Sequence, residues 1–416
     1  MKLLVISDYN NRGGSGYTSI THGLLAELGR REHHLLLLAF NYDGLEHQLN
    51  AGVVPSDPLL IRQQVVAALG GFRPDAALVI MDVPWQHKLR YIQGVVPYLG
   101  IFPIESDPLV HPSDFTMTID TMDAALCETR FGTQLLLDVG IRAQFLPIPV
   151  EPFWRPPSPE ERLAARVQLG VEERFVVLTV ADNHERKNLP VHYATIALLA
   201  GQRIDWPPGS GRWRRYRKAV PETFYILNTK QHAPAFGAVA SYDNAALTDR
   251  FGITDRCLVM NHPDSATGLA REQLRNLYWA ADCFLLLSKA EGLGLPVLEA
   301  MACAVPVVGG AWTGIAESLG NGLRGQVVPA EYSHIDPFHN QVRRWADPWA
   351  ATDALVRVHH GGREIHQMVN RGLEHVRSMS WAASASIFEE VLTNVLKSRP
   401  QAPAAPIAQE RPEATS

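Results

Sequence analysis

The sequence predicts an α/β fold in which two doubly wound, Rossmann-like domains face a central cleft. Apolar runs without alternation are typical of parallel strands buried on both faces. Such runs recur along the chain and alternate with segments of helical spacing. The length of 416 residues suits two domains of ordinary size. Four prolines between residues 152 and 159 indicate an extended connection between them.

The first domain is expected over residues 1–150. The run 3–6 predicts the first strand, and the spacing of Ile20, Leu24 and Leu28 predicts the helix that follows. Further strands are predicted at 33–40, 76–81, 98–102 and 123–127, and a helix at 130–139. Parallel strands end at one edge of a sheet, where α/β proteins hold ligands, so acidic residues just past the strands are candidate site residues. They are Asp8, Asp82, Glu105 and Asp107.

The second domain is expected over residues 151–380, and helical spacing continues beyond it to residue 398. Its predicted strands are 175–180, 224–229, 257–261, 283–287, 305–308 and 325–328. Its predicted helices include 189–199, 350–359 and 364–376, and a last helix is predicted over 382–396. The tail 399–416 is rich in Pro, Ala and Glu and is predicted to be disordered.

The stretch 281–303 carries the most specific motif of the chain. Its apolar strand leads into a short loop in which Gly292 and Gly294 are free to adopt positive φ, and Pro296 suits the first turn of a helix. The free N–H groups and the dipole of a helix N-terminus favour an anion. Glu291 and Glu299 flank this cradle, and carboxylates accept hydrogen bonds from sugar hydroxyls. The arrangement therefore suits a sugar nucleotide.

Two other loops carry residues suited to phosphate. The loop after the first strand contains Gly13 and Gly14 and precedes a helix, but it lacks the full G-x-G-x-x-G pattern, so a plain tight turn is the alternative. The loop after strand 175–180 contains Arg186 and Lys187. Fixed cations there would favour departure of a diphosphate, which gains negative charge in the transition state. An ordinary exposed basic pair is the alternative.

The motif from Glu291 to Cys303, followed by Val305-Pro306-Val307-Val308, resembles the E-x7-E signature of retaining GT-B glycosyltransferases of group 1, or family 4-like. The flanking residues 277–282 and 314–317 agree. The resemblance implies transfer of a sugar from a nucleoside-diphosphate sugar to an acceptor hydroxyl with retention of the anomeric configuration. The acceptor would be a polysaccharide, a lipid-linked glycan or a small molecule. It further implies that a C-terminal helix near 381–398 packs back on an acceptor-side first domain, and that no cofactor or metal is needed.

The same resemblance implies roles for single residues. Glu291 would hold hydroxyls of the donor sugar at the catalytic centre, Glu299 would bind the ribose, and the Arg186–Lys187 pair would stabilise the leaving group. Donor contacts from the loop backbones are implied for Gly13, Gly14, Gly292, Leu293, Gly294 and Leu295. Many relatives place a histidine after a strand of the first domain, and this chain instead has Glu105 and Asp107. Both are candidate catalytic residues, with a loop-capping role as the alternative.

Composition excludes several other classes. The net charge of −5 gives no reason to expect a nucleic acid or an acidic membrane as partner. The four cysteines lack C-x-x-C spacing, which indicates reduced thiols. The apolar start is too short for a signal peptide, and no apolar run reaches transmembrane length, so a cytoplasmic protein is expected. The sequence has no Asp-x-Asp, His-Glu-x-x-His, P-loop or G-x-S-x-G motif.

One segment suggests another acceptor. Residues 201–218 combine arginines with tryptophans and look like an insertion relative to the family. Such residues are suited to nucleic acid, to a protein or to an anionic surface, whereas a solvated loop whose tryptophans pack down is the structural alternative. A third hypothesis is that the protein is a non-catalytic subunit that binds nucleotide sugars. An epimerase or a phosphorylase of the same fold is a further alternative.

Overall fold

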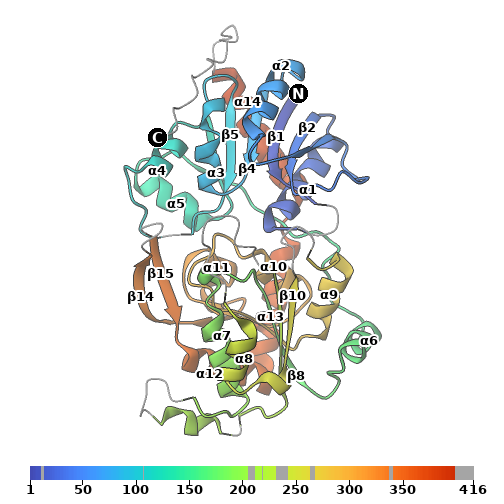
Figure 1. Cartoon of the computed structure of the whole chain (residues 1–416), viewed down its shortest axis with the longest axis vertical. Coiled ribbons are helices and arrows are strands. Elements are labelled where there is room, and N and C mark those ends of the chain that lie inside the picture. The colour runs from blue at the N-terminus through green and yellow to red at the C-terminus, as the bar shows by residue number, and fades with distance from the viewer. Residues whose placement is uncertain are drawn as a thin grey trace.

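Two parallel β-sheets, one in each half of the chain, define two α/β domains that stack end to end (Figure 1). The computed structural model describes residues 1–10, 14–105, 107–204, 211–217, 219–230, 242–262, 268–336 and 341–398. The two Rossmann-like domains confirm the predicted fold class. The proline-rich residues 152–159 lie between the two sheets in the chain, and the last of them, Pro159, begins the first helix of the second domain.

The first sheet has the strand order β3-β2-β1-β4-β5-β6-β7, and all its neighbours pair in parallel. The strands are β1 Lys2–Asp8, β2 His34–Phe40, β3 Gly52–Ser56, β4 Ala76–Ile80, β5 Tyr98–Phe102, β6 Ala124–Cys127 and β7 Gln144–Phe145. Central strands β4 and β5 are buried along their whole length, as their continuous apolar sequence requires. Edge strand β3 was not predicted, because Gly52 and Pro55 interrupt its pattern, and both residues are tolerated at a sheet edge.

The second sheet has the order β10-β9-β8-β11-β12-β13 and is also parallel. Its strands are β8 Phe175–Val180, β9 Thr223–Lys230, β10 Cys257–His262, β11 Cys283–Leu286, β12 Val307–Gly310 and β13 Gln326–Val328. The strand predicted at 305–308 therefore begins two residues later, after Pro306, which has no N–H for a ladder. An antiparallel hairpin of β14 (Ala330–Asp336) and β15 (Gln341–Ala346) follows β13 and was not predicted.

Helices cover both sheets. In the first domain they are α1 Gly16–Arg30, α2 Ile61–Gly71, α3 Val83–Lys88, α4 Asp114–Asp120 and α5 Arg130–Asp138. In the second domain they are α6 Pro159–Leu169, α7 Leu189–Leu199, α8 Asn244–Arg250, α9 Arg271–Ala280, α10 Leu295–Ala302, α11 Thr313–Ser318, α12 Pro348–His360 and α13 Arg363–Arg377. Short 3₁₀ turns are found at Arg90–Ile92, Glu185–Lys187, Arg212–Tyr216, Thr254–Arg256 and Gly320–Gly322.

The last helix, α14 (Trp381–Ser398), crosses back and packs against α1 of the first domain (Figure 1). Its Phe388 and Leu392 are fully buried in the core that the first sheet shares with α1. Gly23 permits the close approach, because a Cβ at this position would lie 2.0 Å from the Trp381 indole.

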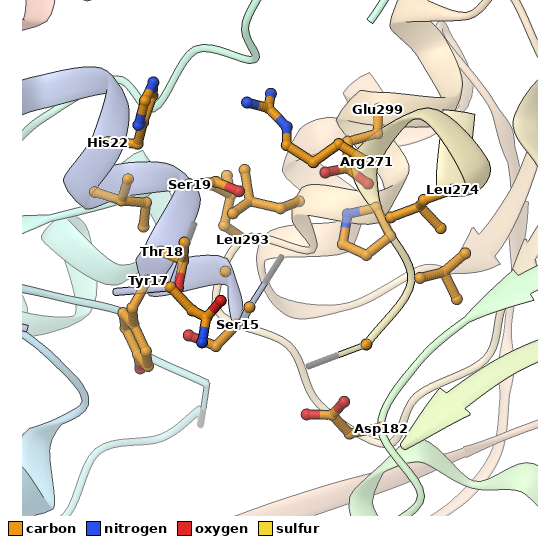
Figure 2. A pocket seen from close by; sticks show the side chains of 18 of the residues that line it. Ser15, Tyr17, Thr18, Ser19, His22, Asp182, Arg271, Leu274, Leu293 and Glu299 are labelled. Carbon is orange, nitrogen blue, oxygen red and sulfur yellow. The ribbon is translucent and has the colours of Figure 1, made fainter. Parts of the chain in front are cut away.

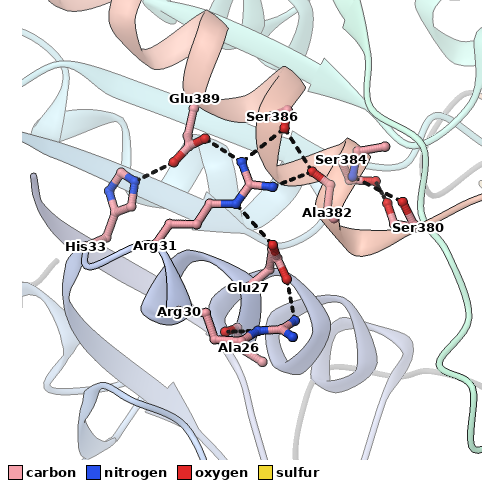
Figure 3. Close-up of polar contacts among 11 residues, drawn as sticks. Ala26, Glu27, Arg30, Arg31, His33, Ser380, Ala382, Ser384, Ser386 and Glu389 are labelled. Atoms are coloured by element: carbon pink, nitrogen blue, oxygen red, sulfur yellow. Dashed lines mark hydrogen bonds and ion pairs between the residues drawn. The ribbon is translucent and has the colours of Figure 1, made fainter.

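Polar contacts also hold α14 in place (Figure 3). Arg31 at the end of α1 donates to Glu389 Oε2 at 2.6 Å and to the Ala382 carbonyl at 2.7 Å. His33 Nε2 lies 2.8 Å from Glu389 Oε1, so the carboxylate accepts from two side chains. These bonds lower the pKa of Glu389 against the opposing effect of its partial burial. The end of the described chain is therefore tied to the first domain.

The predicted disordered tail, 399–416, lies outside the described residues. Within the described part of the chain, none of the helices combines the length and the apolarity that a membrane span requires.

Candidate functional site

A cavity of about 710 Å³ lies between the two domains. The first turns of α1 form one wall, and the loop after β11 and the first turns of α9 and α10 form the other (Figure 2). The carboxyl ends of both sheets contribute to it, as expected for doubly wound domains. Its charged lining residues in the described part of the chain are Glu46, Glu105, Glu128, Glu151, Asp182, Arg186, Lys187, Arg271, Glu272, Glu291 and Glu299.

The loop after β11 fits tightly against both domains. A Cβ on Gly292 would lie 2.1 Å from the Pro103 side chain of the first domain, and a Cβ on Gly314 would lie 1.6 Å from the Gly292 carbonyl oxygen. Gly294 has φ +77° immediately before α10. Only glycine meets these steric demands without strain. The predicted loop residues Gly292, Leu293, Gly294 and Leu295 all line the cavity.

Two helix N-termini face the cavity from opposite walls. Helix α10 begins at Leu295, and α1 begins at Gly16, where a Cβ would lie 3.1 Å from Leu295 Cδ1. The cavity between them therefore receives the positive ends of two helix dipoles, which favours an anionic group there. Gly14 lines the cavity beside α1, and Gly13 lies outside the described residues.

Glu291 is buried at the centre of a charge cluster. Arg186 donates to its Oε2 at 2.8 Å, and Lys187 donates to its Oε1 at 2.5 Å. Burial opposes ionisation of Glu291, but these two cations outweigh it and hold the pKa of this carboxyl far below its usual range. The sequence placed these residues in separate loops, and the structure brings them together at one side of the cavity. Glu291 balances one of these two positive charges, and Glu105, 3.2 Å from Arg186, balances the other.

Glu299 lies one turn into α10, and its carboxyl group reaches the cavity near Arg271 and Leu274 (Figure 2). The Tyr278 hydroxyl donates to Glu299 Oε2 at 2.7 Å and so orients the carboxyl group. Burial raises the pKa of Glu299 to about 7, and the Tyr278 hydrogen bond and Arg271 oppose that rise. The carboxyl group is therefore poised between its neutral and ionised forms near neutral pH.

The two acidic residues predicted on the acceptor side separate in the structure. Glu105 lines the cavity and lies 3.2 Å from Arg186 and 3.9 Å from Arg343, measured between the carboxylate oxygens and the guanidinium nitrogens. Asp107 is not among the lining residues that the structure describes, and its Oδ2 is 3.6 Å from Arg344. The hairpin β14–β15 thus reaches the first domain at both acidic residues.

Sequence reasoning missed two features of this region. Glu128 lines the cavity directly after β6, just as Glu105 follows β5, so the rule that found Glu105 would also have found it. Arg343 is buried in the unpredicted hairpin, 3.5 Å from Asp336. No motif in the sequence signalled that this arginine would approach the cleft.

The described part of the segment 201–218 packs onto the second domain. Tyr216 is buried, stacks on Trp349 with ring centroids 5.7 Å apart, and donates to Asp353. Trp213 is half-buried, with Arg203 and Arg214 each over its ring. None of these residues is among the described residues of the cavity wall. The described residues also contain no group of three or more His, Cys, Asp or Glu side chains suited to a metal ion.

The fold and this cleft define an architecture of the GT-B type, and comparison with known proteins points to the same class. Residues 258–351, which include β11, the glycine loop and α10, match the family model described as "Glycosyl transferases group 1". Two similar solved structures each share 15% sequence identity with this chain and therefore show the fold alone. One is sucrose-phosphate synthase from Thermosynechococcus elongatus, at a TM-score of 0.69 over 96% of this chain and 100% of that one. Another is the Anabaena protein HepE in complex with UDP-glucose, at a TM-score of 0.68 over 95% of this chain and 100% of that one.

Several proteins of similar sequence share one specific name. The chain is 29% identical over 228 residues to the D-inositol 3-phosphate glycosyltransferase of Mycobacterium marinum, which covers 54% of this chain and 39% of that protein. It is 30% identical over 230 residues to the protein of that name from Mycolicibacterium vanbaalenii, which covers 54% of this chain and 42% of that protein. The chain thus spans about two fifths of the relatives it matches. The family model and the two relatives named here are all glycosyltransferases by description.

Proposed function

We propose that this protein is a retaining glycosyltransferase that moves a sugar from a nucleoside-diphosphate sugar to an acceptor hydroxyl on a glycan or a small molecule. One observation carries the proposal. Glu291 and Glu299 reach the same cavity, one on each side of the N-terminus of α10. The match of residues 258–351 to glycosyltransferases of group 1 and the GT-B fold support it.

The donor diphosphate would occupy the space between the two facing helix N-termini. Arg186 and Lys187 would stabilise the negative charge that develops as the bond between the sugar and the phosphate breaks. Because both cations contact Glu291 before a donor is present, they are held in place without reorganisation at the moment of reaction. The departing phosphate oxygen would then accept the proton of the attacking hydroxyl on the same face of the sugar.

Glu299 and Glu291 would bind hydroxyls at opposite ends of the donor. Glu299, oriented by Tyr278, suits the ribose, since an ionised carboxylate accepts two hydrogen bonds. Glu291 would accept from hydroxyls of the transferred sugar. In this arrangement the chain's own residues provide positioning and charge stabilisation, and the proposal includes neither a metal ion nor a cofactor.

Thermal unfolding in the presence of UDP-, GDP-, ADP- and TDP-sugars tests the donor site. We expect one nucleoside diphosphate to stabilise the protein by about 2.7 kcal/mol at a ligand concentration of 100 Kd. The double variant R186A/K187A should lose most of this shift. The matched control R363A/K397A removes two exposed cations elsewhere and should keep it. An unchanged shift in R186A/K187A would contradict the phosphate assignment.

Turnover separates an enzyme from a non-catalytic subunit that only binds nucleotide sugars. With the stabilising donor and a panel of sugar acceptors, we expect release of nucleoside diphosphate and a product with the donor's anomeric configuration. E291A should abolish this release, because the sugar hydroxyls lose their acceptor and two cations lose their counter-charge. Normal turnover by E291A would refute the assigned role of Glu291.

A further inference from the structure

Among the described residues on the first-domain wall of the cavity, two side chains are at least nine-tenths buried and carry a polar atom without a hydrogen-bond partner. The atoms are Oε1 of Glu128 and Oγ1 of Thr18, whose residues are only 5% and 9% exposed. A third such atom, His47 Nδ1, belongs to a side chain that is only half-buried. Both residues line the cavity, and Figure 2 shows Thr18 in the first turn of α1 beside it. A buried polar atom without a partner costs about 1–3 kcal/mol. Two such atoms at one cavity wall therefore indicate a place where a ligand completes the hydrogen bonds.

Local structure explains why these groups remain without partners. Glu128 follows β6, and the next residue, Thr129, caps α5 with its own side chain, which accepts from the Gly132 amide. Glu128 is thus not used as the helix cap. Thr18 lies in α1 opposite Gly14, where a Cβ would approach its Oγ1 to 2.2 Å, so glycine keeps that side of the hydroxyl clear.

The charges around Glu128 restrict what this wall can bind. Glu105 is near enough that its charge, after burial itself, raises the pKa of Glu128, which reaches about 8. The cations next to Glu105 are Arg186, which also pairs with Glu291, and Arg343, which also pairs with Asp336. A phosphate or carboxylate placed against Glu128 would add a negative charge beside Glu105 in a region of low dielectric, where like charges repel strongly, and the repulsion would grow as Glu128 ionises. A hydroxyl or an ammonium group would instead donate to the free oxygen.

The wall of the cavity formed by the second domain is the proposed donor site. Under the proposed function, on which this inference rests, the second domain holds the donor through Arg186, Lys187 and the N-terminus of α10. Thr18 and Glu128 face that donor from the first domain. We propose that Thr18 and Glu128 form the acceptor subsite, and that it takes a sugar or polyol that presents a hydroxyl or ammonium group and carries no phosphate.

The acceptor proposed here differs from the one in the relatives' name. An inositol 3-phosphate acceptor carries a phosphate, whereas the subsite inferred here disfavours one. A hydroxyl group both donates and accepts, so it satisfies Thr18 and Glu128 in either protonation state of the carboxyl group. An ammonium group donates only, so it binds Glu128 best when the carboxyl group is ionised. The two sources of the hydrogen-bond donor therefore differ in how their binding depends on pH.

Calorimetric titration of the full chain with glucose, glucosamine and glucose 6-phosphate, in the presence of UDP, tests the subsite. The three probes share one ring and differ in a single substituent. We expect glucose or glucosamine to bind at least about tenfold more tightly than glucose 6-phosphate. Tighter binding of glucosamine than of glucose, lost when the pH is raised far enough to deprotonate its amine, assigns an ammonium group, and equal binding of glucose assigns a hydroxyl group.

Variants localise the effect. E128Q keeps the size of the side chain but prevents its ionisation, and T18V removes the hydroxyl at nearly constant volume. Each should weaken the favoured probe about tenfold, the strength of one net hydrogen bond. The control E173Q, an exposed carboxylate far from the cavity lining, should bind like the parent.

Three results would overturn the inference: tightest binding of glucose 6-phosphate, an unchanged ranking in both E128Q and T18V, or no binding of any probe. The titration needs no turnover, and donor binding is read separately by thermal unfolding. Failure of the acceptor subsite and failure of the donor assignment are therefore distinguishable.

Discussion

Replacement of Arg186 by alanine should destabilise the second domain through Glu291. Arg186 lies 2.8 Å from Glu291, whose side chain is 7% exposed. Removing one partner of a buried ion pair costs about 3–5 kcal/mol, because the other charge is left without compensation. Lys187 still contacts the carboxylate at 2.5 Å, so we expect the lower end, about 3 kcal/mol. At about 2–4 °C per kcal/mol, the melting temperature should fall by about 6–12 °C.

A double-mutant cycle with E291Q isolates the charge effect. If the loss in R186A comes from an uncompensated carboxylate, E291Q should restore part of the stability in that background. We expect a coupling of about 1–3 kcal/mol, measured from thermal unfolding of the parent, R186A, E291Q and R186A/E291Q at pH 7.5. Equal melting temperatures for R186A and R186A/E291Q would refute the reasoning, since the stability loss would then arise from packing of the arginine stem.

Two further predictions concern protonation and the glycine loop. The pKa of Glu128 is raised by burial to about 8, and that of Glu299 to about 7, so the native state holds protons that the unfolded chain has released above its ordinary value of 4.5. The lowered pKa of His192 and of His375 has the opposite effect on stability below about pH 6.5, the ordinary pKa of histidine. Stability should therefore fall as pH rises from about 6.5 to 8, by a few kcal/mol, and E128Q should remove part of this fall in urea titrations at pH 6.5, 7.5 and 8.5. A flat profile for the parent would contradict the buried-acid assignment. G292A should lower both the melting temperature and donor binding, because its Cβ would lie 2.1 Å from Pro103, whereas the control G70A in α2 meets nothing within 4 Å. G70A should stabilise by about 0.5–1 kcal/mol, and equal behaviour of the two variants would show that the loop can shift without consequence.

The fold class was accessible from the sequence because each central strand is a continuous apolar run and each buried helix repeats its apolar residues. The stretch 283–302 shows this most clearly, since its strand, glycine loop and helix each have a local signal. The hairpin β14–β15 had none. Its strand β14 is largely exposed and polar, so neither alternation nor apolar runs mark it, and its position depends on tertiary contacts with Glu105 and Asp107.

The sequence predicts most residues of the candidate site but not the contacts between them. The motif indicated Glu291 and Glu299, and their position in a loop indicated Arg186 and Lys187, but no pattern in the sequence predicts that both cations pair with Glu291. Glu128 was not predicted although it follows a strand, because an acidic residue between a strand and a helix is common and no motif surrounds this one. Burial raises the pKa of Glu128. This burial depends on how the two domains pack together, which the periodicity of the sequence does not predict.

Arg186 contacts carboxylates of both domains. Through it, donor binding at the second domain would be coupled to the contact between the two domains, which the sequence motif alone does not indicate. The guanidinium group lies between Glu291 of the second domain and Glu105 of the first, at 2.8 Å and 3.2 Å. A donor diphosphate would add negative charge at the same cation and so compete with both carboxylates. Weakening the contact with Glu105 would loosen one polar link between the domains, while the diphosphate would form new contacts with the N-termini of α1 and α10. Helices α1 and α10 come from opposite walls of the cavity. The diphosphate would therefore take over the role of the Arg186–Glu105 ion pair and join the two domains itself.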